Sequence, residues 1–185
     1  QALAVLAGIA SQDKYPQIFS TLKTEEHASP YMEKYVMEAL FRMGYGDYAL
    51  ERAEKRFKAM VNNTEYATLF EGWEIGSADF GGGTTNHAWS GGTITVLASE
   101  MCGIKPTKAA WEEFEIRPAK ATAGHSYSIS FPTVKGQVKS DWRAGSGKWT
   151  ITVPDGCKAK VYLPGKGSYT VYSGGEHTIT CPPCK

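Results

Sequence analysis

The sequence predicts an α+β chain in which helical hairpins are followed by a small antiparallel β-sandwich. Up to about residue 108, apolar residues recur at spacings of three and four, which is the helical period. After Pro106, short alternating runs follow one another and are separated by glycine-rich turn signals. Strands that recur at about 8–12 residues are typical of a sandwich. We therefore expect two domains, residues 1–108 and residues 109–185.

Capping signals locate the helices of the first domain. Ser29 and Pro30 suit the N-cap and the first position of a helix, and Gly44 suits its end. A connection of about three residues then leads to the next helix, which predicts an antiparallel hairpin. An apolar stretch at the N-terminus, residues 2–10, has the same period. The other helices are expected to cover about residues 30–43, 47–61 and 87–101.

The second domain is predicted to consist of short strands. Turn signals separate them at residues 144–147, 154–156, 164–167 and 173–175. Its three tryptophans, Trp111, Trp142 and Trp149, are expected to lie in the sandwich core or to pack between the domains rather than to serve as sugar platforms. The predicted strands are Phe114–Ile116, Ser126–Phe131, Thr133–Trp142, Lys148–Val153, Ala159–Leu163, Tyr169–Tyr172 and His177–Thr180.

Composition excludes several classes of protein. The chain has 185 residues, a net charge of +1 and no basic stripe, so a nucleic-acid partner is not expected. The longest apolar run, Ala2–Ala10, is too short to span a bilayer and lacks the basic start of a signal peptide. That run resembles the last turns of a helix from a longer chain, so we expect a fragment whose partners include the rest of its own polypeptide.

The four cysteines do not predict a metal site or a cofactor. Cys102 lies in an apolar helical pattern and is expected to be a buried thiol. Cys181 and Cys184 have the CxxC spacing, but no second pair and no nearby histidine pair accompanies them. A disulfide between these two and a pairing with Cys157 are both open.

The densest chemistry lies between Leu69 and Gly92. This stretch contains three carboxylates, several aromatic rings, an Asn-His pair and three consecutive glycines. Carboxyl groups can act as general acids or bases, and aromatic rings offer a flat apolar face to a sugar ring. The composition therefore fits a sugar pocket. It also fits an acidic, glycine-rich connection around a buried tryptophan. The residues concerned are Glu71, Glu74, Asp79, Phe70, Trp73, Trp89, Asn86, His87 and Gly81–Gly83.

A combination of motifs in a fixed order extends over nearly the whole chain. It resembles the C-terminal part of the inverting α-L-rhamnosidases, glycoside hydrolase family 78. The resemblance implies the late helices of an (α/α)6 barrel, then the β-sandwich that closes the protein. The motifs are Leu69-Phe-Glu-Gly-Trp73, Asn86-His87, Gly103-Ile-Lys-Pro106, Trp111-Glu-Glu-Phe-Glu-Ile-Arg-Pro118 and Val134-Lys-Gly136.

The resemblance also implies roles for single residues. Glu71 would be the general base that activates water, with Glu74 as the second choice. Trp73 would wall the sugar pocket, and His87 after Asn86 would bind the sugar or orient the water. Other expected pocket residues are Trp89 and His27. The general acid of the family lies outside this sequence. The chain departs from the family pattern at Phe70, Gly72, Glu74 and Ala88-Trp89, which leaves the exact sugar open.

The sequence therefore predicts a fragment of a glycosidase that acts on terminal α-L-rhamnosides in rhamnosides, polysaccharides or glycoconjugates. It would carry the base but not the acid, so the isolated chain is expected to be inactive. The alternative is a carbohydrate-binding or structural C-terminal module with no catalytic role. The carboxylates, His87 and Trp73 cluster in the helical part rather than in the β part, which favours the enzyme.

Overall fold

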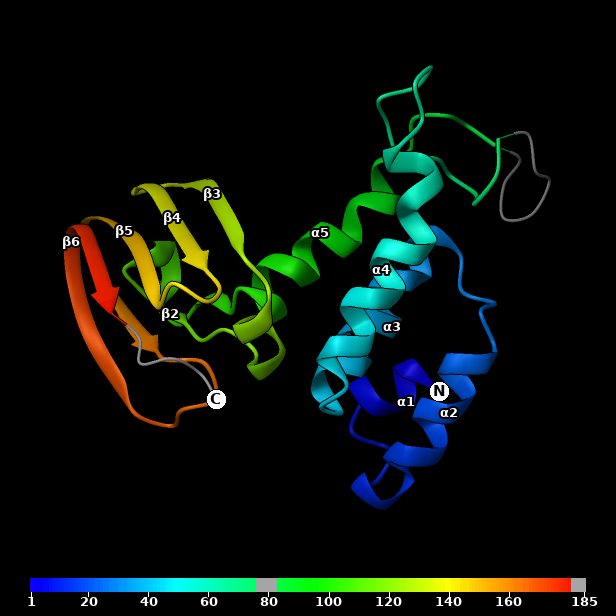
Figure 1. Ribbon diagram of the computed structural model, residues 1–185, viewed down its shortest axis with the longest axis horizontal. Helices are drawn as coiled ribbons and strands as arrows, with labels where there is room; N and C mark the ends of the chain where they lie inside the picture. Colours follow the sequence, from blue (N-terminus) through cyan, green and yellow to red (C-terminus); the bar gives the residue numbers. More distant parts are fainter. Residues whose placement is uncertain (76–82, 181–185) are drawn as a thin grey trace. The chain divides into compact units, whose positions relative to one another are not determined.

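The computed structural model describes residues 1–75 and 83–180, and these form two compact units (Figure 1). The first unit is Gln1–Val96 and the second begins at Leu97. The sequence predicted a division after residue 108. The division comes earlier because the first strand, β1 (Ile104–Pro106), already belongs to the sheet of the second unit.

The first unit is built around α3 (Pro30–Arg42). Against this helix pack α1 (Ala2–Leu6), α4 (Gly46–Val61) and α5 (Gly92–Val96), and α2 (Tyr15–Thr24) precedes it. Met37, Ala39 and Leu40 of α3 are fully buried at 0% exposure, which explains the central position of the helix. Short 3₁₀ turns occur at Gln12–Lys14 and Ala88–Gly91.

Local signals placed the two main helices correctly. The side chain of Ser29 accepts a hydrogen bond of 3.3 Å from the Met32 amide, and Gly44 adopts φ +90° after the helix. The hairpin from α3 to α4 is confirmed. The helix α2 was not predicted, although Pro16 lies in its first turn. The described residues give hairpins and irregular segments, and they do not by themselves show an (α/α)6 barrel.

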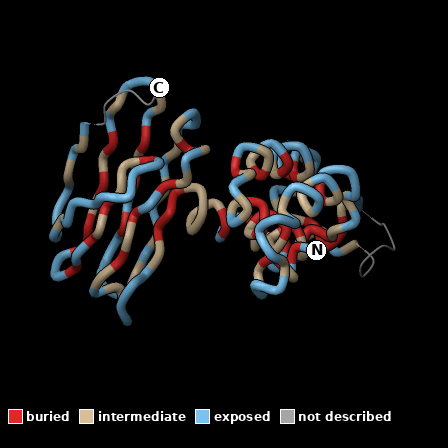
Figure 2. Tube along the Cα trace, turned by 90° about the horizontal axis from the view of Figure 1, so that it is seen from below, coloured by how far each residue is buried: buried red, intermediate tan, exposed pale blue. Residues whose placement is uncertain are grey.

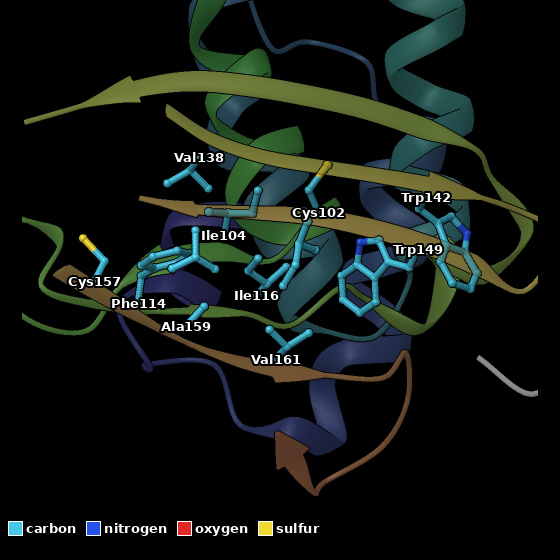
Figure 3. Close-up of a cluster of buried hydrophobic side chains, with 12 residues drawn as sticks. Cys102, Ile104, Phe114, Ile116, Val138, Trp142, Trp149, Cys157, Ala159 and Val161 are labelled. Carbon is cyan, nitrogen blue, oxygen red and sulfur yellow. The ribbon is translucent and has the colours of Figure 1, made fainter. Parts of the chain in front are cut away.

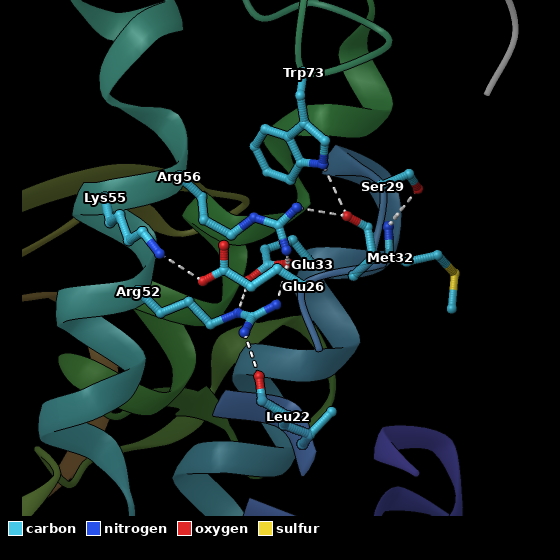
Figure 4. Close-up of polar contacts among 10 residues, drawn as sticks. Leu22, Glu26, Ser29, Met32, Glu33, Arg52, Lys55, Arg56 and Trp73 are labelled. Carbon is cyan, nitrogen blue, oxygen red and sulfur yellow. Dashed lines mark hydrogen bonds and ion pairs between the residues drawn. The ribbon is translucent and has the colours of Figure 1, made fainter. Parts of the chain in front are cut away.

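A buried ion cluster holds α3 and α4 together (Figure 4). Glu33 is 0% exposed and accepts hydrogen bonds from Arg52 and from Arg56 Nη1, the latter at 3.1 Å. Burial alone lowers the pKa of Arg52, but the hydrogen bond and charge of Glu33 outweigh it and raise that pKa. Arg56 also donates to the Ala28 carbonyl at 2.9 Å and lies 4.1 Å from the centre of the Trp73 ring.

The second unit contains one curled six-stranded sheet. Its strands follow a π-helical turn at Leu97–Met101, and short 3₁₀ turns occur at Ala109–Trp111 and Lys120–Gly124. The order is β1-β2-β5-β4-β3, and β6 pairs along β5. The strands after β1 are β2 (Glu113–Ile116), β3 (Tyr127–Thr133), β4 (Gly136–Arg143), β5 (Lys148–Tyr162) and β6 (Tyr169–Thr180).

The predicted turns at residues 154–156 and 173–175 are wrong, because β5 and β6 each continue through them. The two glycine-rich segments face each other, since Val153 pairs with Gly175 and Lys158 with Ser173 across a bulge. Before the bulge β5 pairs with β4, and after it β5 runs parallel to β2. The expected antiparallel sandwich is therefore a single curled sheet with one parallel pair.

A tightly buried cluster fills the sheet unit (Figure 3). Buried positions alternate with less buried ones in the second half of β4, and Figure 2 shows buried segments interspersed with exposed ones in the sheet unit. Trp149 is 0% exposed and donates a hydrogen bond of 2.8 Å to Ser140, whose hydroxyl also lies 3.0 Å from that of Tyr127. Burial raises the pKa of Tyr127. The prediction that Trp142 and Trp149 belong to the core is confirmed.

Cys102 should resist modification in the folded protein. The residue is 3% exposed, and burial raises the pKa of its thiol from 9.0 to about 12, so little reactive thiolate forms. The pKa of the Cys102 thiol is higher in the folded state than in the unfolded state. The stability gained by burying the neutral thiol is therefore fully present below pH 9.0 and is lost as the pH rises toward about 12. Peptide-resolved mass spectrometry after iodoacetamide treatment should show Cys102 unlabelled until denaturant is added.

Cys157, at 2% exposure, should be protected in the same way. Equal labelling of either thiol in the native and the denatured protein would contradict the buried core described above. Cys181 and Cys184 lie outside the described residues. A disulfide between them and a pairing of one of them with Cys157 therefore both stay open.

Gly103→Ala should cost about 2–4 kcal/mol of unfolding free energy. Gly103 has φ +71°, and a Cβ there would lie 1.9 Å from the Arg117 carbonyl oxygen, so both strain and overlap oppose the change. Gly145→Ala is the matched control in the same unit, because Gly145 has φ +78° with nothing within 4 Å of its Cβ. It should lose only about 1 kcal/mol. Equal losses in urea unfolding would show that the close approach to Arg117 is unimportant.

Candidate active site

Two segments of the first unit lie side by side and carry the candidate site. The Glu71 amide donates to the Thr84 carbonyl at 3.0 Å, and the His87 amide donates to the Leu69 carbonyl at 2.9 Å. The hydroxyl of Ser90 also donates to the Phe70 carbonyl at 2.6 Å and is fully buried. These bonds bring Glu71 and His87 together although the connecting residues 76–82 are outside the described part of the chain. Asp79 is among those residues.

Glu71, Thr84 and His87 form a hydrogen-bonded cluster. The Thr84 hydroxyl lies 2.9 Å from Glu71 Oε2 and 2.9 Å from His87 Nδ1, and the Thr84 amide lies 3.4 Å from the same carboxylate oxygen. Glu71 Oε2 and His87 Nδ1 are 3.6 Å apart. The Glu71 side chain is 10% exposed and that of His87 is 33% exposed. The neighbouring Glu74 is exposed, so the structure separates the two candidate bases by burial.

A depression of about 560 Å³ lies beside this cluster. Asn86, His87 and Thr68 are its polar lining residues, and Met60 and Leu69 are among its apolar ones. Glu71 does not line it. His87 therefore belongs both to the hydrogen-bonded cluster and to the wall of the depression.

Aromatic rings continue from His87 toward the start of α3. The ring centres of His87 and Trp89 are 4.3 Å apart, and those of Trp89 and Tyr31 are 5.1 Å apart. Trp89 is 38% exposed and Tyr31 is 37% exposed. Tyr31 and Tyr35 extend the row, with their hydroxyls 3.2 Å apart. The sequence analysis missed both tyrosines, although Tyr31 follows the predicted helix start at Ser29 and Pro30.

Trp73 and His27 are in different surroundings. The Trp73 indole donates to the Ala28 carbonyl at 2.8 Å, and its ring lies against Arg56 (Figure 4). Its polar group is therefore used within the fold. The His27 side chain is 87% exposed and contacts Glu25 at 2.8 Å, rather than the Glu71 cluster. Asn86 is exposed.

Among residues 1–75 and 83–180, no three His, Cys, Asp or Glu side chains are arranged to hold a metal ion. None of the helices described there has the length and apolar character needed to cross a membrane.

A nearly buried carboxylate, bonded to a hydroxyl and close to an imidazole, is suited to proton transfer. Exposed rings near a depression with both polar and apolar lining residues are suited to the alternating polar and apolar faces of a sugar. Comparison with known proteins shows which proteins this chain resembles.

Residues 103–178 match the family described as the bacterial alpha-L-rhamnosidase C-terminal domain. No curated protein sequence matches it. The solved structures most like it include the native α-L-rhamnosidase of Aspergillus terreus, with a TM-score of 0.76 and 20% identity over 96% of this chain. In fold and in its family match, the chain resembles the C-terminal part of α-L-rhamnosidases of glycoside hydrolase family 78.

Two further rhamnosidases show the same fold. The enzyme of Streptomyces avermitilis, solved with L-rhamnose, has a TM-score of 0.69 and 17% identity over 96% of the chain. The enzyme of Dictyoglumus thermophilum has a TM-score of 0.67 and 18% identity over 96% of the chain. The matched part is 23%, 21% and 24% of the three enzymes, in the order given, so this chain spans about a quarter or less of their length.

Proposed function

We propose that this chain is the base-carrying part of an inverting α-L-rhamnosidase, with Glu71 as the general base. The observation that carries the proposal is the burial of Glu71 in hydrogen-bonding contact with Thr84 and beside His87. The relatives in fold are described as α-L-rhamnosidases, and one of them was solved with L-rhamnose. Both facts support a sugar substrate that ends in α-L-rhamnose.

Inversion needs two carboxyl groups about 6.5–9.5 Å apart, with the attacking water next to one of them. Glu71 would accept the proton of that water. An acid from a part of the polypeptide outside this sequence would protonate the departing oxygen. The water would add its hydroxyl to the anomeric carbon and give its proton to Glu71, while the bond from that carbon to the departing oxygen breaks.

The neighbouring residues would hold the sugar. His87 and Asn86 would bind its hydroxyls, a role supported by their position in the lining of the depression. Trp89 would offer a ring face to the apolar side of the sugar, and Tyr31 would extend that surface. Trp73 would contribute its ring alone, because its N–H is bonded to Ala28. His27, which contacts Glu25, is the weakest member of the proposed pocket.

A second candidate is a C-terminal module without a catalytic role. The family match favours it, because residues 103–178 lie within the sheet unit and do not include Glu71 or His87. In that case the sheet would bind carbohydrate or support a neighbouring domain. Loss of sugar binding after changes in the sheet, with none after changes at His87, would favour this second candidate.

The stereochemistry of the product tests the proposal. The protein that carries this chain should release β-L-rhamnose first from an aryl α-L-rhamnoside, as followed by proton NMR before the sugar mutarotates. The isolated 185 residues should give no turnover, because they lack the acid. First release of the α-anomer, no hydrolysis of any α-L-rhamnoside, or robust turnover by the isolated chain would each overturn the proposal.

A further inference from the structure

Thr84 has one hydroxyl proton and two hydrogen-bonding neighbours. Its oxygen lies 2.9 Å from Glu71 Oε2 and 2.9 Å from His87 Nδ1. A hydroxyl donates one hydrogen bond and accepts others through its lone pairs. At most one of these two contacts can therefore use the threonine proton, and the other must bring a proton of its own.

When Glu71 is ionised, the number of available protons decides which group donates in each of the two hydrogen bonds of Thr84. A carboxylate only accepts, so the Thr84 proton points to Glu71 Oε2. The Thr84 oxygen must then accept from His87, so Nδ1 carries a proton. The opposite assignment would place two sets of lone pairs against each other at 2.9 Å, which is unfavourable. The Thr84 amide, 3.4 Å from Oε2, adds a second donor on the same side of the carboxylate.

We propose that Thr84 is a positioning residue that keeps His87 in the Nδ1–H tautomer and thereby leaves Nε2 as a hydrogen-bond acceptor for a sugar hydroxyl. This inference rests on the proposed function for its substrate, but the tautomer is a property of the chain alone. His87 is placed for the role because it also lines the depression with Asn86. The pocket then recognises a hydroxyl as a donor, while the same threonine holds the carboxylate of Glu71 in place.

The tautomer is measured by NMR of the ring nitrogens in the chain labelled with ¹⁵N-histidine. The chain has four histidines, so His87→Gln assigns the signal by its disappearance. At a pH where the ring is neutral, Nδ1 should resonate as a protonated nitrogen and Nε2 as an unprotonated one. Thr84→Val, which keeps the shape and removes the hydroxyl, should yield the Nε2–H form or a mixture. Thr84→Ser should restore the wild-type signals.

Kinetics in the protein that carries this chain supply the second readout. Thr84→Val should lower kcat/KM on an aryl α-L-rhamnoside by about 10–100-fold, the value of a hydrogen bond to a charged group, and Thr84→Ser should recover most of it. An Nε2–H tautomer in the wild type would overturn the inference. So would an unchanged tautomer in Thr84→Val, because Glu71 alone would then fix the ring. Failure of the proposed function is a different result, namely no rhamnosidase activity with the tautomer as stated.

Discussion

If the chain belongs to the proposed rhamnosidase, Glu71→Gln should lower the kcat of that enzyme by about 10²–10⁴-fold, with a much smaller change in KM. Glutamine keeps the shape of the side chain and its contact with the Thr84 hydroxyl, but it cannot take a proton from water. A base acts mainly in the transition state, so its loss appears in kcat. Steady-state kinetics on an aryl α-L-rhamnoside measure both parameters.

Glu74→Gln is the matched control, because Glu74 lies three residues away and is exposed. It should change kcat only slightly. Added azide should partly rescue Glu71→Gln and yield a rhamnosyl azide of inverted configuration, since azide attacks without needing a base. A collapse of Glu74→Gln with an active Glu71→Gln would transfer the role to Glu74. Wild-type rates in both variants would remove this segment from the catalytic site.

Glu33→Gln should reduce the free energy of unfolding by about 3–5 kcal/mol. The change leaves Arg52, at 1% exposure, and Arg56, with a side chain at 8%, buried without their counter-charge. Unpaired buried charges are costly because water cannot solvate them. The midpoint of urea unfolding, followed by circular dichroism of the helices, measures the loss.

Glu26→Gln provides the comparison, because Glu26 in the connection before α3 also pairs with a residue of α4. Glu26 binds Lys55 of α4 at 2.9 Å, but their side chains are 32% and 67% exposed. This pair should contribute less than about 1 kcal/mol. A similar small loss in both variants would mean that the Glu33 cluster does not hold α3 to α4, and the account of the first unit would need revision.

The sequence could predict what local signals decide. The helix α3 follows from Ser29, Pro30 and Gly44, each of which acts on its own neighbours. The same kind of signal misled at Gly156 and Gly175, both of which adopt positive φ. A glycine-rich segment bends the chain either in a turn or in a bulge, and only the partner strand decides between them.

The residues of the candidate site were also only partly predictable from the sequence. Glu71 and His87 were identified from the residues around them and from the family resemblance, and the structure brings them within 3.6 Å. Their catalytic and binding roles stay proposals. Thr84 and Tyr31 escaped notice because a single threonine or tyrosine carries no signal in sequence. Their importance arises from contacts with Glu71 and Trp89, which lie far along the chain.

The parallel pairing of β2 with β5 has a consequence for how the chain folds. Glu113 pairs with Lys158, so β2 leaves the ribosome well before the segment that completes its ladder. Until β5 has been synthesised, β2 with its apolar residues Phe114 and Ile116 can pair only with β1 in the sheet. Long-range pairings of this kind slow folding, and they leave apolar, aggregation-prone strands exposed until the pairing is complete. Acquisition of the sheet during synthesis should therefore be governed by the arrival of β5 rather than by any local hairpin.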